Sequence, residues 1–556
     1  MAYDFAHGSG TANDPYLIAT EADFWGMFDV SSGGQPNFIS KHFRQSADIQ
    51  ITQSVSQSRL TRCVYDGDNR IISGLKKGAA NLKSSTWKNS IFSNCTNENP
   101  SWYYPALFLW TWVDDDDEEN LGPESELHDI QLLDSPGIYI FAGEDTIATN
   151  LTVKNSGGFV GGTLVDSEVS NCYGENLSHT QDYYATGALC DVFGCEFENI
   201  VVVNVEYEDT DCAAGGMVGE TYYSNFKNCV VLGAKITGDE ASGGFAGAIY
   251  GGTFEDCYAL GVEVTLDPSY GRVAGGFVGE VYDLQLWREG TWHPFVFTRC
   301  IAHGEIDADA ADGAGGFAGY ADNTNALDVG SIFSQCGAEV SVSNSSEYSG
   351  GFVGSAYGPW PWIASEYLPD IMFEDCYALG DSVLSDSENA ISNGGFCGIA
   401  EDVTFERCFS KGAVSGGVNV GGFCGEDAGY YYSEEEEVEY RYVEGIDCYF
   451  DHDVAPLDDD YATPKTTAEM KTQSTFSGWG FTNIWKLGAF DQEEHWTRTD
   501  TSGEYSFIAP IGKSGVEVML VLDPSDGYPF LRFETKKTLT EVTEPCNFYV
   551  RGRMPE

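Results

Sequence analysis

The sequence predicts an all-β protein: a right-handed parallel β-helix, or β-solenoid, with capping segments and a small C-terminal β region. Three observations predict it: a repeated Gly-Gly-aromatic-small-Gly motif, a second repeated motif that ends in Cys, and a nearly constant distance between the two. Composition agrees, because glycine is frequent (65 of 556 residues) and aromatic residues make up 14% of the chain. Short strands joined by Gly-rich turns, with no helix pattern between them, are typical of solenoids.

The glycine motif recurs eight times, with copies that begin at residues 157, 215, 243, 275, 315, 350, 394 and 421. The second motif is an apolar residue, two polar residues and Cys. Its copies are Phe226–Cys229, Phe254–Cys257, Phe297–Cys300, Phe333–Cys336, Phe373–Cys376 and Phe405–Cys408, with Val169–Cys172 as a weaker member. The Gly-Gly-Phe-x-Gly repeat is therefore about 28–34 residues long.

Equivalent residues of such repeats stack about 4.8 Å apart, one rung on the next. We therefore expect one interior column of cysteines and another of the phenylalanines from the glycine motif. A buried free Cys acts as a small hydrophobic side chain that fills such a column. Disulfides between stacked rungs are the alternative, since the spacing is compatible with them.

These units resemble the GLUG repeat of bacterial and archaeal surface proteins and of some phage proteins. Gly8–Ile18 resembles the segment that opens many such proteins, and Phe43–Ile49 and Tyr65–Leu75 resemble their first rungs. Thr466–Lys471 and Gly527–Leu531 resemble their closing segment. The resemblance implies a solenoid, and it implies a surface-associated or adhesive role without implying an activity.

Three parts are expected along the chain. Residues 1–60 form an N-terminal cap or attachment segment, residues 61–446 the β-solenoid with loop insertions, and residues 447–556 a C-terminal capping region. About 40 residues separate Trp485 from Gly527, more than the closing segment needs. We therefore expect a small β insert there.

Three consecutive units are longer than the rest, and their insertions fall at the same point of the unit. Insertions at one point of a repeat lie on one face, which is often the binding face. Two of them are rich in aromatic residues, which suit stacking on sugars or packing against a protein. The candidate receptor-binding residues are Trp287, Trp292, His293, Tyr357, Trp360, Trp362 and Tyr367. The alternative is that these loops fold back and cover each other.

The formal charge of −59, from 87 acidic and 28 basic residues, argues against nucleic acid and anionic membranes as partners. Such a charge suits concentrated salt, where a halophilic host is one explanation, and an acidic surface protein is the other. No run of about 18 apolar residues predicts a membrane span. Met1–Gly10 lacks the basic and apolar segments of a signal peptide, so we expect folding in a cytoplasm.

No motif for catalysis stands out, and pairs of carboxylates carry no information in a chain with 87 acidic residues. We therefore expect no enzymatic activity, no catalytic residues, no metal and no cofactor. The expected function is structural: a tail-fibre or spike-like appendage of a tailed virus that binds host-surface glycan or glycoprotein. Its expected location is the virion, with other tail proteins as partners. A homotrimer stays open, because viral fibres are often trimers but no heptad pattern supports one. A glycan-cleaving depolymerase and a cellular surface adhesin are the alternatives.

Overall fold

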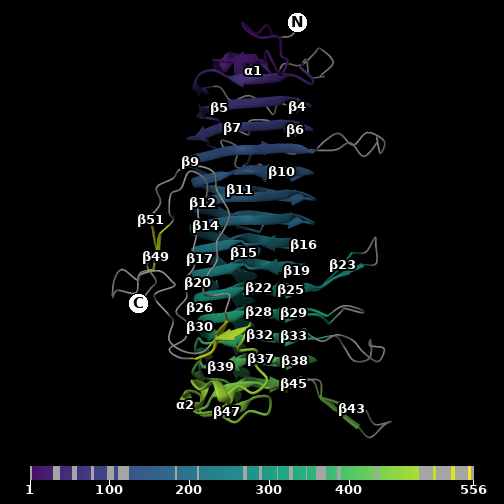
Figure 1. Cartoon of the computed structure of the whole chain (residues 1–556), viewed down its shortest axis with the longest axis vertical. Helices are drawn as coiled ribbons and strands as arrows, with labels where there is room; N and C mark the ends of the chain where they lie inside the picture. Colours follow the sequence, from purple (N-terminus) through teal and green to yellow (C-terminus); the bar gives the residue numbers. More distant parts are fainter. Residues whose placement is uncertain are drawn as a thin grey trace.

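The structure, a computed structural model, describes residues 3–28, 38–52, 59–76, 81–96, 106–109, 124–181, 185–209, 212–266, 272–286, 291–309, 311–324, 330–345, 347–358, 371–384, 390–428, 430–433, 438–441, 443–486, 505–508, 528–531 and 549–552. The chain winds into a tall column of stacked rungs, with the N-terminal end at the top of Figure 1. Strands of successive rungs pair in parallel and in register, for example Val218–Ala246 and Ala246–Val278. The predicted right-handed parallel β-helix is confirmed.

Each rung of the middle part contributes to four rows of strands. Row A follows the glycine pair and contains β13 (Leu189–Phe193), β16 (Val218–Lys227), β19 (Ala246–Glu255), β22 (Val278–Tyr282), β28 (Ala318–Asp322), β32 (Val353–Tyr357), β37 (Cys397–Glu401) and β42 (Cys424–Asp427). β16 and β19 bend into row B, which continues with β25 (Phe295–Thr298), β29 (Ile332–Ser334), β33 (Ile371–Glu374), β38 (Val403–Glu406) and β45 (Val443–Ile446).

Row C follows the cysteine position of each rung. β12 (Glu168–Gln181) and β14 (Glu196–Asp209) run through both row B and row C. Row C continues with β17 (Val230–Gly238), β20 (Tyr258–Leu266), β26 (Ile301–Asp307), β30 (Gly337–Ser345), β34 (Tyr377–Ala378), β35 (Ser382–Leu384), β39 (Phe409–Ser410), β40 (Val414–Ser415) and β46 (Tyr449–Asp451). Row D, the short strands that end in the glycine pairs, contains β15 (Ala214–Gly215), β18 (Ala241–Gly243), β21 (Val273–Gly275), β27 (Gly313–Gly315), β31 (Tyr348–Gly350), β36 (Ser392–Gly394) and β41 (Asn419–Gly421).

Stacked rungs continue toward both ends of the column. The N-terminal rungs are formed by β1 (Tyr16–Ile18), β2 (His42–Gln45), β3 (Ile49–Gln50), β4 (Arg59–Thr61), β5 (Val64–Ser73), β6 (Asn81–Lys83), β7 (Thr86–Ser93), β8 (Ala106–Leu109), β9 (Ser125–Glu144), β10 (Thr146–Thr149) and β11 (Thr152–Val165). At the other end, β47 (Thr463–Lys465) pairs with β46.

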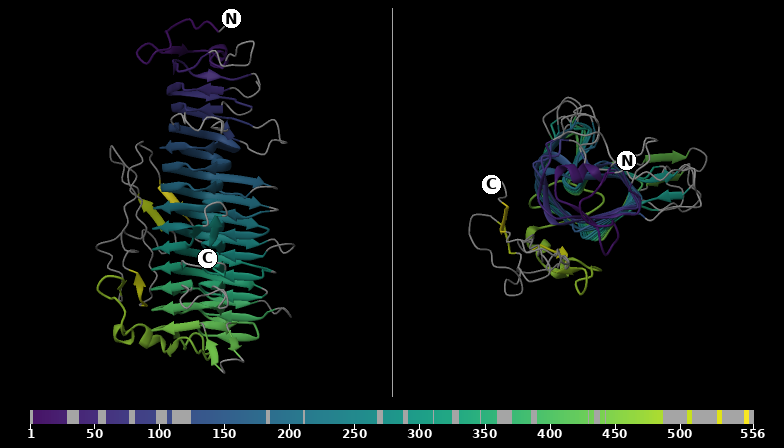
Figure 2. Two further views of the ribbon diagram at one scale, coloured as in Figure 1. Left: turned by 90° about the vertical axis from the view of Figure 1, so that its right-hand side faces the viewer. Right: turned by 90° about the horizontal axis from the view of Figure 1, so that it is seen from above.

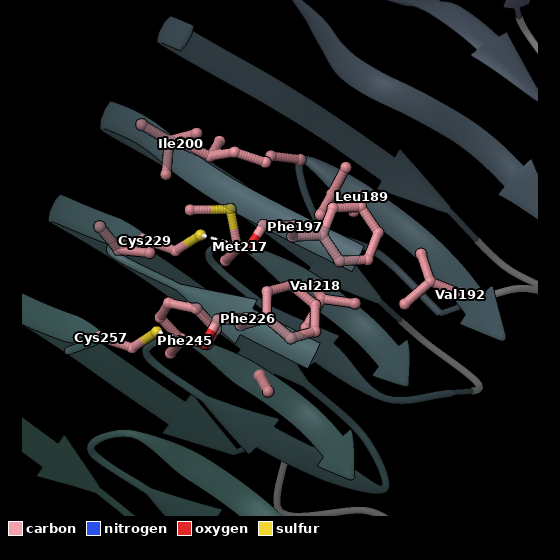
Figure 3. Packing of buried hydrophobic residues seen from close by; sticks show 14 of the residues in the cluster. Leu189, Val192, Phe197, Ile200, Met217, Val218, Phe226, Cys229, Phe245 and Cys257 are labelled. Carbon is pink, nitrogen blue, oxygen red and sulfur yellow. Dashed lines mark hydrogen bonds between the residues drawn. The ribbon is translucent and has the colours of Figure 1, made fainter. Parts of the chain in front are cut away.

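Two phenylalanine columns run through the interior. In the column from the glycine motif, the rings of Phe245, Phe277, Phe317, Phe352, Phe396 and Phe423 stack 4.6–4.9 Å apart and within 12° of parallel. The second column is formed by the phenylalanines that precede the cysteines, and Phe197 and Phe226 begin it (Figure 3). The columns meet edge to face, a favoured geometry for aromatic pairs; Phe317 and Phe333, for example, lie 5.7 Å apart at 89°.

The cysteines form the third interior column, and the described cysteines are free thiols, so the disulfide alternative is wrong for them. The Cys257 thiol donates to the carbonyl oxygen of Phe226 in the preceding rung at 3.5 Å, and Cys300 donates to that of Phe254 at 3.3 Å. Burial raises the pKa of Cys172 to about 12. The Cys172 thiol is therefore inert at neutral pH and serves as packing.

A left-handed corner joins row B to row C immediately before each position of the cysteine column, which holds Ile200 in β14. Asn171, Asn199 and Asn228 adopt φ values of 54–59° there, a region that asparagine tolerates better than most residues. Their side chains form a ladder: the Asn199 amide donates to Asn171 at 3.1 Å, and Asn228 donates to Asn199 at 3.2 Å. In later rungs the same corner holds Arg299 and Arg407, at φ 56° and 54°.

Both ends of the column are capped. Helix α1 (Glu21–Gly26) begins with a capping box between Thr20 and Asp23, buries Phe24 and covers the N-terminal end of the column (Figure 1). At the other end, Asp459 accepts from the backbone N–H groups of Phe423 and Cys424 at 2.7 and 2.8 Å. This carboxylate therefore replaces the carbonyl groups of a missing rung and blocks further strand pairing.

The C-terminal part leaves the bottom of the column and packs against its outer surface. It contains α2 (Thr467–Met470), a 3₁₀ turn (Gln473–Thr475), β48 (Trp485–Lys486) paired antiparallel with β50 (Phe530–Leu531), and β49 (Tyr505–Ile508) paired antiparallel with β51 (Tyr549–Gly552). The expected small C-terminal β region is confirmed. None of the helices in the described ranges has the length and apolar character needed to cross a membrane.

Candidate functional site

The insertions emerge from one corner of the column, between rows A and B. In the rungs of β16 and β19 the chain passes through this corner with Tyr223 at φ 40° and Gly251 at φ 67°. Longer segments follow β22, β28, β32 and β42 at this corner before the chain re-enters row B, whereas between β37 and β38 it passes directly, with Asp402 at φ 52°. The hairpin β23 (Leu284–Leu286)–β24 (Thr291–His293) follows β22, and the hairpin β43 (Tyr430–Ser433)–β44 (Val438–Arg441) follows β42. The prediction that the insertions share one point of the unit is confirmed, and the β43–β44 hairpin adds one that the motif spacing had not shown.

Both hairpins project from the same side of the column in Figure 1, and the end-on view in Figure 2 places them away from the C-terminal strands β49 and β51. A single lateral face therefore carries both hairpins. We call the junction of rows A and B the insertion corner.

A ladder of half-buried aromatic side chains lines the outside of row A at the insertion corner. The tyrosine ladder consists of Phe193, Tyr222, Tyr250, Tyr282, Tyr320 and Tyr357. Its first three neighbouring pairs stack with ring centroids 4.3, 4.6 and 5.5 Å apart and rings within 10° of parallel. The last two pairs, through Tyr320, are tilted at 5.6 and 5.5 Å. Register makes the ladder from Phe193 to Tyr282, because equivalent outward positions of parallel strands lie directly above one another. Tyr320 is in register with Glu280, two residues before Tyr282, so its ring reaches the ladder from a neighbouring position.

Carboxylates of the same row accept hydrogen bonds from the ladder hydroxyls. The Tyr222 hydroxyl donates to Glu220 at 2.7 Å, and the Tyr320 hydroxyl donates to Asp322 at 2.9 Å. Glu280 accepts from two tyrosines of adjacent rungs, Tyr282 at 3.2 Å and Tyr250 at 3.4 Å. The face thus alternates aromatic rings with fixed hydrogen-bond acceptors.

Several carboxyl groups on or directly after the strands of row A hold protons more strongly than usual. Burial, together with the charges of Glu220 and Asp209, raises the pKa of Asp191 to about 8. Burial also raises the pKa values of Glu220 and Glu280, and it raises that of Asp283 to about 7. The charge of this face therefore changes near neutral pH.

We expect Asp191→Asn to stabilise the protein at pH 8.5 and to leave its stability nearly unchanged at pH 4. The pKa of Asp191 is about 8 in the folded protein and 3.8 in the unfolded chain. The stability of the wild-type protein therefore falls as the pH rises from about 4 to about 8. Removing the titration would recover up to about 6 kcal/mol at pH 8.5, since each pKa unit corresponds to about 1.4 kcal/mol. Urea denaturation at both pH values measures this, with Glu206→Gln as an exposed control. An equal difference at both pH values would contradict the assignment.

The structure places two of the predicted binding residues along the insertion corner. Tyr357 forms the last step of the tyrosine ladder, 5.5 Å from Tyr320. His293, at the end of β24, lies with its ring 5.4 Å from that of Tyr223, and its backbone packs so closely on Gly251 that a Cβ there would clash. Trp292 belongs to β24, but its side chain lies outside the described part. The other predicted residues, Trp287, Trp360, Trp362 and Tyr367, lie outside the described residues.

Sequence reasoning missed most of the tyrosine ladder, although a signal for it is present. An aromatic residue recurs seven positions after the first glycine of the motif in four copies, at Tyr222, Tyr250, Tyr282 and Tyr357. Repetition at a fixed offset in a solenoid means stacking, so this pattern predicts a surface column as directly as the cysteines predict an interior one. Among the described residues, no group of three or more His, Cys, Asp or Glu side chains is arranged to hold a metal ion.

No family model matches this sequence, and a comparison with curated proteins finds no match. Among solved structures, the chain is similar to the crystal structure of a "putative immunoglobulin A1 protease from Bacteroides ovatus". The identity is 13%, the match covers 87% of this chain and 93% of the other, and the TM-score is 0.22. A TM-score of 0.22 is too low for the activity of that protein to bear on this chain.

Proposed function

We propose that this protein is a rigid, surface-binding appendage of a tailed virus particle, which recognises a glycan or glycoprotein of the host surface through the insertion corner. The observation that carries the proposal is the tyrosine ladder, a continuous aromatic and carboxylate strip on the face from which the hairpins project. Tyrosine supplies apolar area and a hydroxyl at low entropic cost, and fixed carboxylates accept hydrogen bonds from sugar hydroxyls.

The column itself suits a spacer. Successive rungs contact mainly their neighbours, and the stacked phenylalanine columns run through the middle of the chain without a break. The resemblance to GLUG repeats supports a surface-associated role. Attachment to other tail proteins through the N-terminal end, and location in the virion, belong to the same proposal.

A ladder variant, Tyr250→Ala with Tyr282→Ala, is expected to bind host cells ten- to a hundredfold more weakly than wild type. Loss of two aromatic contacts corresponds to about 1–3 kcal/mol, at about 1.4 kcal/mol per factor of ten. A loop variant, Trp287→Ala with Trp360→Ala, should lose binding in the same assay and keep the fold.

The measurement is binding of the labelled full chain to intact cells of candidate hosts across a salt series. Lys235→Ala in row C is the matched control, since its side chain is 58% exposed and lies outside row A. Folding is checked by circular dichroism. Unchanged binding by a folded ladder variant would refute the tyrosine ladder as the site, and unchanged binding by the loop variant would refute the loops.

One observation favours a second candidate, a glycan-cleaving depolymerase on the same scaffold. Asp191 and Glu220 occupy equivalent positions of adjacent rungs, and the Asp191 carboxyl has a pKa near 8. A carboxyl group that keeps its proton near neutral pH beside a second carboxylate is the arrangement that glycosidases use. Incubation with host-envelope polysaccharide tests it: new reducing ends that are lost in Asp191→Asn support cleavage, and their absence in wild type removes this candidate.

A further inference from the structure

A stripe of apolar side chains runs lengthwise along the outside of row C. We call it the outer stripe; it consists of Tyr173, Val201, Val203, Val230, Leu232, Tyr258, Leu260 and Ile301. Their strand neighbours Val202, Val231 and Ala259 belong to the interior core. Because successive side chains of a strand point to opposite faces, the outer stripe points away from the interior.

The outer stripe is nevertheless shielded from solvent. Val230 and Ile301 are fully buried, and the exposed fractions of the other members do not exceed 8%. On the same strands, β14 and β17, the outward side chains of Glu206 and Lys235 are 70% and 58% exposed. The shielding is thus confined to the apolar positions, which means that something covers this strip alone.

At the lower end of the column the cover is visible. Tyr377, Phe409 and Tyr449 continue the line of the outer stripe on β34, β39 and β46. They pack against aromatic and apolar side chains of the C-terminal part, and all of these residues form one cluster with the outer stripe. The covering residues are Met470, Phe476, Trp479, Trp485, Tyr528 and Leu531.

The same C-terminal part has enough chain to continue upward. Residues 487–527 connect β48 to β50, and these two strands pair through Trp485 and Leu531. From β34 to β12 there are six rungs, about 29 Å at 4.8 Å per rung. A path there and back needs about 18 residues at 3.3 Å each, fewer than residues 487–527 provide. The last strand, β51, pairs with β49, which belongs to the segment between β48 and β50. The last described strand of the chain is therefore held beside this segment.

The segment between β48 and β50 also contains apolar residues that suit the apolar outer stripe. Val516–Leu522 reads Val-Glu-Val-Met-Leu-Val-Leu, an apolar run with a single charge. In an extended chain Val516, Val518, Leu520 and Leu522 share one face. Left in water, such a segment would promote aggregation.

We propose that the C-terminal segment, with Val516–Leu522 as its apolar part, is a strap that packs lengthwise on the outer stripe of the same molecule. The strap stabilises row C along the rungs and prevents this apolar face from pairing copies of the chain. β49 and β51 lie on a different side of the column from the insertion hairpins (Figure 2). The strap is therefore independent of the proposed binding face.

Limited trypsin digestion of the full chain tests the strap, with Lys513 as the reporter site and mass spectrometry as the readout. We expect cleavage after Lys513 to be at least tenfold faster in Leu232→Asp with Leu260→Asp than in wild type. Leu520→Asp, a substitution in the strap itself, should accelerate cleavage after Lys513 by a similar factor. Glu206→Gln, an exposed position on row C, is the matched control and should cleave as wild type does.

Equal cleavage after Lys513 in wild type and Leu520→Asp would overturn the strap. Leu520→Asp leaves the rungs unchanged, so it decides the matter even if the row C variant fails to fold. Sedimentation velocity tests the alternative that a second copy of the chain covers the outer stripe. A wild-type dimer that Leu232→Asp with Leu260→Asp dissociates, without faster cleavage after Lys513, would assign the outer stripe to a second copy and overturn the strap.

Discussion

Replacement of Phe317 by Ala is expected to lower the free energy of unfolding by about 3–5 kcal/mol. Phe317 is fully buried and stacks between Phe277 and Phe352 at 4.8 and 4.9 Å. Its edges also meet Phe297 and Phe333 at 5.5 and 5.7 Å. The backbone ladder on either side prevents the rungs from closing over the space, so Ala would leave a cavity and remove four aromatic contacts.

Urea denaturation measures the loss, and hydrogen exchange locates it. In a one-dimensional stack we expect the increased exchange to centre on the rung of β28 and its two neighbours. Phe317→Leu is the control, since it keeps most of the volume and should cost clearly less. A loss below about 1 kcal/mol for Phe317→Ala would contradict a stabilising role of the phenylalanine column.

Replacement of Arg407 by Asn is expected to destabilise the lower end of the column by about 3 kcal/mol. The Arg407 guanidinium donates to both oxygens of Asp375 at 2.9 and 3.0 Å and also contacts Glu374 and Glu406. Asp375 is buried, and its Oδ1 also accepts from the Trp485 indole at 2.8 Å. Without the guanidinium a buried carboxylate loses its cation, and the anchor of the C-terminal part loosens.

Asn is the appropriate replacement because it tolerates the φ of 54° at this corner, so the charge is removed without backbone strain. Arg299→Asn is the matched control: it occupies the same corner at φ 56° and contacts Asp256, whose side chain is more exposed (15% against 2% for Asp375). We expect the control to lose less stability. Indole fluorescence during denaturation reports the release of Trp485, and equal losses for the two variants would contradict the buried-charge explanation.

The interior of the rungs could be predicted from sequence because the pattern that encodes it is local. Phe and Cys recur at fixed offsets from the glycine pair, and a parallel register converts equal offsets into vertical columns. The common position of the insertions followed from the same arithmetic. The left-handed corner was also encoded, since the residue before each Cys is repeatedly Asn, Asp, Gln or Arg.

The tyrosine ladder and the outer stripe show that periodicity does not decide whether an outward-facing side chain is exposed or covered. Tyr250 and Tyr258 both point outward, and both recur within the same repeat, yet one lies in a half-exposed ladder and the other in a shielded stripe. Alternation along a strand separates inside from outside, but it carries no information on which part of the chain later returns to cover an outer face. Periodicity does not predict the C-terminal cap either. Asp459 accepts hydrogen bonds from the N–H groups of Phe423 and Cys424, and no repeat contains an equivalent of Asp459.

The sequence by itself therefore determined the β-helix, its interior columns and the corner from which the insertions emerge, because each depends on spacing within one repeat. The tertiary structure alone decided which outer face is open, which is covered, and how Arg407, Asp375 and Trp485 join the C-terminal part to the column. These contacts link residues far apart in the chain, and their free energies depend on burial and charge pairing that exist only after the rungs have stacked.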